Sequence, residues 1–365
     1  MANGSQVRST GRAVVIGRAV IAGALLGLGV GCAGGLDVLG LGADDAEIVA
    51  VARSMADGGD LPGAHAEYER LLAEHPGSVG VAVGQAYLQM LGDDLAGADA
   101  TLAAALPSAG DAAGAIHLRR ALLALRWGGR LDDVRDHAEE SGLPAGALLA
   151  AEVYLVDLEH ERAAALLRDA SDAPGAVGQV AAAYLDMMDS GDLHLGELAD
   201  ATALWALGER QNACEAAESP LIELTSEHPD RDALLLLWAG RAVTSGLPAV
   251  ARRLVDMMSG PPVGQAWRLQ ATDAMVLLSE GKASAALGKF ASLRQAVASG
   301  DVPADGLADA LATACAISKD ADTAMKLVQG VESAAAAKCL LRWGDAAAAI
   351  GVAPDGPLRS FLEGM

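Results

Sequence analysis

Apolar residues recur three or four positions apart along most of the chain, in segments separated by glycine-containing turns. Residues 48–76 are the clearest example. Their regularly spaced apolar positions are Ile48, Val51, Ala52, Met55, Ala64, Tyr68 and Leu71. This spacing places the first four on one face of a helix and the last three on one face of a second helix. Because Gly58-Gly59-Asp60-Leu61 separates the two stripes, the pattern predicts an antiparallel helical hairpin.

The hairpin pattern repeats along the chain. Each predicted pair contains a small or β-branched residue where the first helix would approach the second. These residues are Ala64, Ala98, Val134, Ala164, Ala217, Val250, Ala286 and Ala324. The separations are 34, 36, 30, 53, 33, 36 and 38 residues. All but one lie near a period of about 34 residues. The long interval contains apolar stretches at 177–188 and 195–207, which predict extra helices or one decayed repeat. Pro220, three residues after Ala217, predicts that its helix starts late or kinks.

Two segments carry a recognisable motif. Residues 64–76 contain Ala64, Tyr68, Leu71 and Glu74-His75-Pro76, and residues 217–229 contain Ala217, Leu221, Leu224 and Glu227-His228-Pro229 at identical spacing. The pattern resembles the tetratricopeptide repeat. The resemblance implies an all-α solenoid of helical hairpins wound as a right-handed superhelix over residues 45–352, followed by a tail at 353–365. It also implies a non-enzymatic protein that binds a protein or peptide partner.

Glycine or acidic residues mark most of the predicted turns. Gly59, Gly92, Gly129, Gly246 and Gly281 are each expected to end a helix in the left-handed conformation. The acidic pairs Asp93-Asp94 and Asp132-Asp133 are expected to cap the helices that follow, because aspartate accepts the unpaired amide hydrogens of a first helical turn.

The net charge of the chain is −22, and aromatic residues make up 3% of it. A strongly acidic chain repels phosphate backbones and anionic lipid surfaces, so nucleic acid is not an expected partner. The acidic residues are dispersed, which is typical of a solvated helical surface.

The first 31 residues resemble an export signal. Arg8, Arg12 and Arg18 precede an apolar stretch of 13 residues, Ala19 to Gly31, which ends at Cys32. This order matches a secretory signal, and the cysteine after small residues resembles a bacterial lipoprotein processing site. The site departs from the family pattern because Leu28 lies one position too early. We therefore expect a signal peptide or membrane anchor at 1–31 and a linker at 32–44. An ordinary cleaved signal and an uncleaved anchor are the alternatives to lipidation at Cys32. By resemblance, Ala33 favours sorting to the outer membrane.

The sequence contains no recognisable catalytic or metal-binding motif. Residues 158–162 contain His160 between two glutamates, but no second histidine lies four residues on. The glycines at 27–31 lie inside the export segment and not between a strand and a helix. We therefore predict no catalytic residue, no metal and no cofactor. Cys214, Cys315 and Cys339 are expected to be small buried side chains. A Cys315–Cys339 bridge between neighbouring helices is the alternative.

The first helix of each hairpin is expected to line a concave binding face. By the spacing of the first repeat, the inward positions are Val49, Arg53, Ala56, Val83, Tyr87, Met90, Arg119, Leu123 and Arg126. From these we predict Arg53, Tyr87, Arg119 and Arg126 as partner-binding residues. The arginines would meet carboxylates of an extended peptide, and the tyrosine would supply apolar contact.

These observations predict a non-enzymatic protein-binding or scaffold protein of the bacterial cell envelope, tethered by lipid at Cys32 and facing the periplasm. The first alternative is a structural subunit of a larger envelope-spanning complex. The second is an enzyme or small-ligand-binding protein whose site lies inside the superhelix and combines residues distant in sequence.

Overall fold

The computed structural model describes residues 48–57, 60–76, 78–126, 128–329, 331, 334–342, 349 and 351–353. Eighteen α-helices and two short 3-10 helices account for the regular structure of these residues, and none of them lies in a strand. The predicted all-α class is therefore confirmed. The predicted export segment at 1–31, the linker at 32–44 with Cys32, and residues 354–365 of the predicted tail lie outside the described residues.

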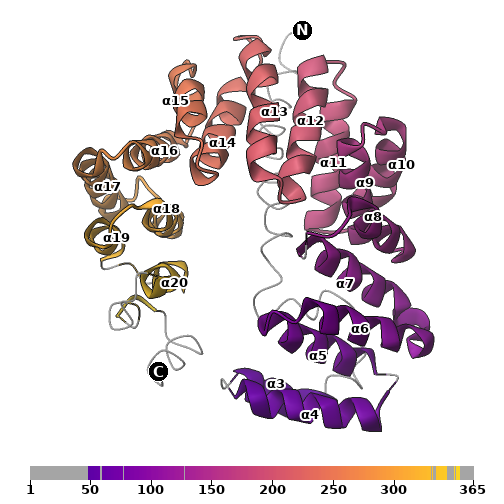
Figure 1. Cartoon of the computed structure of the whole chain (residues 1–365). Coiled ribbons are helices and arrows are strands. Elements are labelled where there is room, and N and C mark those ends of the chain that lie inside the picture. Colours follow the sequence, from indigo (N-terminus) through magenta and orange to yellow (C-terminus); the bar gives the residue numbers. More distant parts are fainter. Residues whose placement is uncertain are drawn as a thin grey trace. The chain divides into compact units, whose positions relative to one another are not determined.

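The described chain divides into two compact parts, with the boundary in the sequence between residues 209 and 210. In the first part the helices are α3 Ala50–Asp57, α4 Leu61–Glu74, α5 Val79–Leu91, α6 Leu95–Ala105, α7 Ala113–Arg126, α8 Leu131–Glu140, α9 Pro144–Val156, α10 His160–Ser171, α11 Ala176–Met188 and α12 Leu193–Ala206. Short 3-10 turns at Leu106–Ser108 and Gly110–Ala112 join α6 to α7. Consecutive helices pack as the hairpins α3/α4, α5/α6, α7/α8, α9/α10 and α11/α12 (Figure 1).

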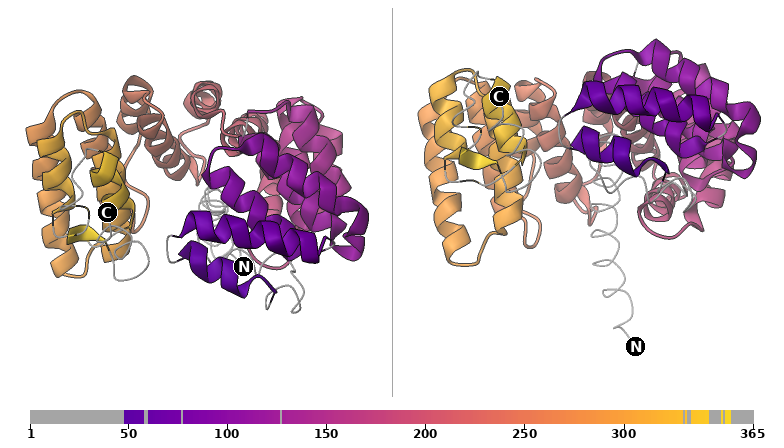
Figure 2. Two further views of the ribbon diagram at one scale, coloured as in Figure 1. Left: turned by 60° about the horizontal axis from the view of Figure 1, so that its bottom comes forward. Right: turned by 90° about the horizontal axis from the view of Figure 1, so that it is seen from below.

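In the second part the helices are α13 Arg210–Glu223, α14 Arg231–Thr244, α15 Pro248–Asp256, α16 Ala266–Ser279, α17 Ala283–Ala298, α18 Ala304–Ile317, α19 Ala321–Val328 and α20 Ala334–Arg342. The hairpins here are α14/α15, α16/α17 and α18/α19. Helix α13 packs on α14 and α15, and α20 packs on α18 and α19. Figure 2 shows the last hairpins of this part as near-parallel rods in two further views.

The small residues predicted to lie between paired helices are buried. All eight, from Ala64 to Ala324, are at most 9% exposed. Seven of them lie on the second helix of a hairpin, and Ala217 lies on α13. Because a methyl or isopropyl group at these positions keeps the helix axes close, the sequence period corresponds to helix packing.

The long interval between Ala164 and Ala217 contains α11 and α12, so the prediction of extra helices there is confirmed. Pro220 does not delay the start of its helix. Helix α13 begins at Arg210, and Pro220 lies in its last turn, where the amide of Leu224 donates to the Pro220 carbonyl at 2.9 Å. The prediction of a late start was wrong because proline in a last turn removes a single helical hydrogen bond.

Two of the predicted left-handed glycines are confirmed and two are wrong. Gly246 and Gly281 have φ of 79° and 80°. After α5, however, Gly92 has φ −81° and Asp93 takes the left-handed conformation with φ 62°. After α7 this conformation falls on Gly128 and not on Gly129. Gly59 lies outside the described residues.

One of the two predicted acidic caps is confirmed. The Asp94 carboxylate accepts the amide of Gly97 at 2.9 Å and caps α6. Asp132 and Asp133 lie inside the first turn of α8, whose N-cap is Arg130 and has no side-chain cap bond. They were wrongly predicted as caps because α8 begins at Leu131, before both residues, although negative charge in a first turn is still favourable.

Glycines allow three close approaches between neighbouring elements in the first part. A Cβ on Gly84 of α5 would lie 2.3 Å from the ring of Tyr68 on α4. A Cβ on Gly114 of α7 would lie 2.3 Å from the carbonyl oxygen of Ser141, which follows α8. On Gly146 of α9 it would lie 2.4 Å from the carbonyl oxygen of Ala138. Since real Cβ contacts are longer, a side chain at Gly114 or Gly146 would displace backbone, and one at Gly84 would displace the Tyr68 ring.

In the second part a buried arginine joins the ends of two helices. Arg231 Nε donates to the carbonyl of Leu224 at 3.0 Å, just after α13. Its Nη1 donates to the carbonyl of Met257 at 3.0 Å, at the end of α15. A cation at helix C-termini is stabilised by the partial negative charge of the unpaired carbonyls.

None of the described helices combines the length and the apolar composition needed to cross a membrane.

Candidate functional site

The four predicted binding residues lie on the first helices of consecutive hairpins. Arg53 is half-buried on α3, and Tyr87 is 38% exposed on α5. Arg119 is half-buried on α7, and Arg126 is exposed in the last turn of the same helix. Arg119 and Arg126 are seven residues apart, which places them on one face of α7 about 10 Å apart along the axis. Helix α5 packs against α7, so Tyr87 lies on the element next to these two arginines.

Three positions predicted to face inward are instead core residues. Val49, Val83 and Leu123 are at most 6% exposed. Val49 packs in a cluster with Tyr68 and Leu71, and Val83 and Leu123 belong to one cluster around α5 and α6. The prediction failed because a first helix packs against its own partner and also against the next hairpin, which leaves a narrow outward stripe.

Arg119 differs from its neighbour in its ionic environment. Arg120 makes a bidentate pair with Asp99 of α6, with Nε–Oδ1 2.7 Å and Nη2–Oδ2 3.1 Å. Within the described part of the chain, no carboxylate lies within ion-pair distance of Arg119, and burial lowers the pKa of this guanidinium. A half-buried cation without an anion loses hydration without electrostatic compensation. Arg119 can therefore gain from a carboxylate supplied by another molecule.

Arg126 has a plainer explanation. It lies in the last turn of α7, where the helix dipole favours a cation. It adds positive charge beside Arg119 in a chain of net charge −22. Of the predicted residues, Arg119 therefore carries the strongest indication of binding.

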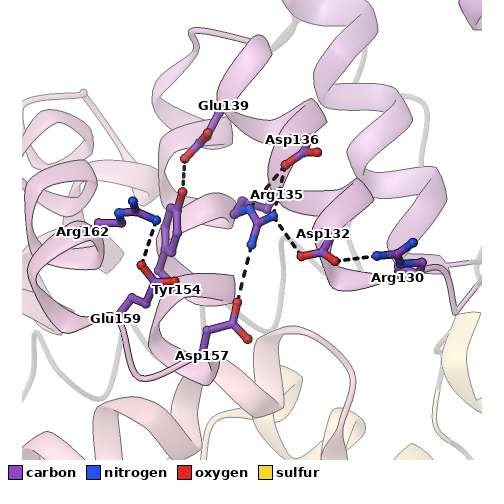
Figure 3. A network of polar contacts seen from close by, with 9 residues as sticks. All are labelled: Arg130, Asp132, Arg135, Asp136, Glu139, Tyr154, Asp157, Glu159 and Arg162. Carbon is purple, nitrogen blue, oxygen red and sulfur yellow. Dashed lines mark hydrogen bonds and ion pairs between the residues drawn. The ribbon is translucent and has the colours of Figure 1, made fainter.

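A polar network joins α8, α9 and α10 (Figure 3). Its members are Arg130, Asp132, Arg135, Asp136, Glu139, Tyr154, Asp157, Glu159 and Arg162. The Tyr154 hydroxyl donates to Glu139 Oε1 at 2.6 Å, and this hydrogen bond raises the pKa of the tyrosine. The guanidinium groups of Arg135 and Arg162 lie 5.7 and 5.5 Å from the centroid of the Tyr154 ring. Because its charges are already paired, we interpret this network as a structural link between hairpins.

One buried carboxylate has the electrostatic property expected of an active-site acid. Burial raises the pKa of Glu152 on α9 to about 8, although a hydrogen bond from Tyr184 opposes the shift. The Tyr184 hydroxyl donates to Glu152 Oε1 at 3.2 Å. Such a shift is frequent at catalytic sites, but Glu152 is 6% exposed and packed among helices. We interpret Glu152 and Tyr184 as a structural pair.

Cys214, Cys315 and Cys339 are buried free thiols. Cys315 on α18 and Cys339 on α20 share one apolar cluster, so the predicted placement on neighbouring helices is confirmed. Burial raises the pKa of the Cys315 thiol, and a hydrogen bond with Cys339 adds a smaller upward shift. The alternative of a bridge is not formed in this structure.

A group formed by His117, His137 and Glu140 was not predicted from the sequence. Their side-chain ligand atoms all lie within 4.8 Å of one another. His137 and Glu140 are three residues apart on α8, a spacing visible in the sequence, whereas His117 comes from α7. Its two histidines lie on different helices, so the four-residue spacing typical of helical metal ligands does not reveal it.

Comparisons with known proteins give structural neighbours. No protein-family model and no curated protein matches the chain. A tetratricopeptide repeat protein from Parabacteroides merdae ATCC 43184 is 15% identical, with a TM-score of 0.34, over 70% of this chain and 93% of that one. The P58(IPK) TPR domain is 14% identical, with a TM-score of 0.24, over 82% of this chain and 97% of that one. The helix pairs described above, and not these similarities, identify the fold as an array of helical hairpins.

Proposed function

We propose that this chain is a non-enzymatic protein-binding or scaffold protein of the bacterial cell envelope. It binds an extended segment of a partner protein along α5 and α7. The observation that carries the proposal is Arg119, a half-buried guanidinium for which the described residues supply no carboxylate. A stack of helical hairpins presents its first helices as a continuous surface, which is the usual mode of partner binding in α-solenoids.

The chemistry of this surface defines the partner. Arg119 provides a planar group that binds a carboxylate in bidentate geometry. Arg126 adds a second cation on the same face, and Tyr87 offers an exposed aromatic ring on the adjacent helix. The expected partner segment therefore carries acidic side chains or a C-terminal carboxylate beside an apolar residue.

Charge reversal at Arg119 tests the proposal. We expect Arg119→Glu to weaken partner binding about thirtyfold, because truncation or reversal of a desolvated charge pair costs at least about 2 kcal/mol. The partner would be captured from detergent-solubilised native envelopes, identified by mass spectrometry and then titrated against purified wild type and variant.

Arg168→Glu is the matched control. Arg168 is an exposed arginine on α10, the second helix of its hairpin. This variant is expected to bind like the wild type, and circular dichroism would establish that both variants keep their helices. Equal affinity of Arg119→Glu and wild type would exclude α7 as the binding surface.

We propose further that Cys32 carries the membrane tether. The support is the order of a basic head, an apolar stretch and a cysteine after small residues. Cys32→Ser is expected to move the chain from the membrane to the soluble fraction on cell fractionation, and Cys214→Ala is expected to leave it bound. Membrane retention of Cys32→Ser would reject lipidation as the anchor.

A further inference from the structure

Three side chains of types that can ligate metals converge between α7 and α8. His117 Nδ1 lies 2.9 Å from Glu140 Oε2, and His137 Nδ1 lies 3.3 Å from the same oxygen. The centroids of the two imidazole rings are 5.7 Å apart, with the planes inclined at 44°. Both histidines therefore direct the same ring nitrogen toward one carboxylate oxygen.

The convergence places two ring nitrogens against one acceptor oxygen. The His117 Nδ1 atom is buried and has no partner with hydrogen-bond geometry in the described structure, despite its short distance to Glu140. A neutral imidazole nitrogen and a carboxylate oxygen are both acceptors unless the nitrogen carries the proton. His137 Nδ1 makes a hydrogen bond with this oxygen when it carries the proton, whereas the buried His117 Nδ1 has no hydrogen-bond partner among the described residues. A metal ion among the three atoms would engage the lone pairs of both nitrogens and of the oxygen.

Two features of the backbone build this arrangement. His137 and Glu140 are separated by three residues on α8, which places them on one face of the helix. Gly114 lies one turn before His117 on the same face of α7. It approaches the carbonyl of Ser141 so closely that a Cβ would not fit. The close approach of these helix ends brings His117 within reach of Glu140.

We propose that His117, His137 and Glu140 form a binding site for a divalent transition-metal ion of the Zn²⁺ class. Two imidazole nitrogens and one carboxylate oxygen are ligands that zinc accepts, whereas Mg²⁺ and Ca²⁺ prefer oxygen alone. Zinc bound at 2.0–2.1 Å to each ligand would hold ligand atoms about 3.4 Å apart. The ligand atoms in this structure lie up to 4.8 Å apart, so small side-chain rotations would be needed to bring all three to zinc-binding distance.

The ion would have two consequences for the fold. It would cross-link α7 to the end of α8, because His117 comes from one helix and the other two ligands from the next. Three protein ligands leave one position of a tetrahedral site for water or for a side chain of a partner. Glu140 is 56% exposed at its side chain, so solvent reaches the site from the side of this ligand.

The test uses the full-length chain purified without a polyhistidine tag and stripped with chelator. Isothermal titration with ZnCl₂ is expected to show one binding site in the wild type. In His117→Gln and His137→Gln the Zn²⁺ affinity of this site is expected to fall at least about tenfold, because even the loss of a residue that only supports a ligand costs that much. Co²⁺ is expected to give the visible absorption of a tetrahedral site in wild type and not in these variants. Zn²⁺ is also expected to raise the thermal midpoint of the wild type only.

His160→Gln is the matched control. His160 Nε2 lies 3.0 Å from Asp200 Oδ1, a histidine–carboxylate pair without a second histidine. This variant is expected to bind Zn²⁺ like the wild type. If a histidine variant fails to fold, Glu140→Gln tests the same site at an exposed position. Zn²⁺ affinity that is unchanged in all three ligand variants, or no binding by wild type at micromolar Zn²⁺, would overturn the proposal.

Discussion

Glu152→Gln is expected to stabilise the protein in alkaline solution and to leave its stability nearly unchanged near pH 5. The folded protein raises the pKa of Glu152 from 4.5 to about 8, because the carboxyl is buried on α9. Between these values the folded protein holds a proton that the unfolded chain has lost. Unfolding therefore releases a proton, and the free energy of unfolding falls as the pH rises through this range.

The size of the effect follows from the shift. From pH 5 to pH 9 the wild type is expected to lose about 4 kcal/mol of stability through this one group. Glutamine has no such titration and still offers an oxygen to the Tyr184 hydroxyl. The difference in unfolding free energy between variant and wild type should therefore grow by about the same amount over this range.

Urea unfolding of both proteins at the two pH values measures this difference. Glu139→Gln is the control, because Glu139 also accepts a tyrosine hydroxyl but is exposed. Its effect is expected to stay below about 1 kcal/mol at either pH. Parallel pH profiles for wild type and Glu152→Gln would show that Glu152 is not buried as described.

Gly146→Ala is expected to destabilise the protein by about 3 kcal/mol, because overpacking forces backbone to move. A methyl group at this position would lie 1.9 Å from Ser141 Oγ and 2.4 Å from the carbonyl oxygen of Ala138. The second of these is backbone at the end of α8, so α8 and α9 would separate. Thermal and urea unfolding measure the loss.

Gly196→Ala should have the opposite sign. Gly196 lies in the first turns of α12, as Gly146 does in α9, but its Cβ position has no atom within 4 Å. Alanine there is expected to stabilise the helix by about 0.5–1 kcal/mol. If both substitutions changed stability equally, the close approach at Gly146 would be absent in solution.

The fold was predictable because its information is local. Each hairpin requires apolar residues at helical spacing and a small residue such as Ala64 or Ala286 at the contact, and both features are visible in the sequence. Turn details were less predictable. The left-handed residue after α5 is Asp93 and not Gly92, because the hydrogen bonds that end a helix decide which residue takes that conformation.

The site was predicted less completely, for two physical reasons. Transfer of one repeat's spacing to the next assigned Val83 and Leu123 to the surface, although a first helix is buried on two sides. The group of His117, His137 and Glu140 combines two helices, so no local spacing reveals it. Glu152 did leave a signal, since it is the one charged residue within α9, but burial on every side of α9 was not foreseen.

Photocrosslinking in native cells tests most directly whether the first helices bind the partner. The crosslinking residue p-benzoylphenylalanine would replace Tyr87 on α5 or Arg168 on α10, one aromatic position on a first helix and one exposed position on a second helix. We predict a specific crosslinked partner from position 87 that disappears when Arg119→Glu is added, and none from position 168. A partner captured from position 168, with none from position 87, would contradict binding along α5 and α7.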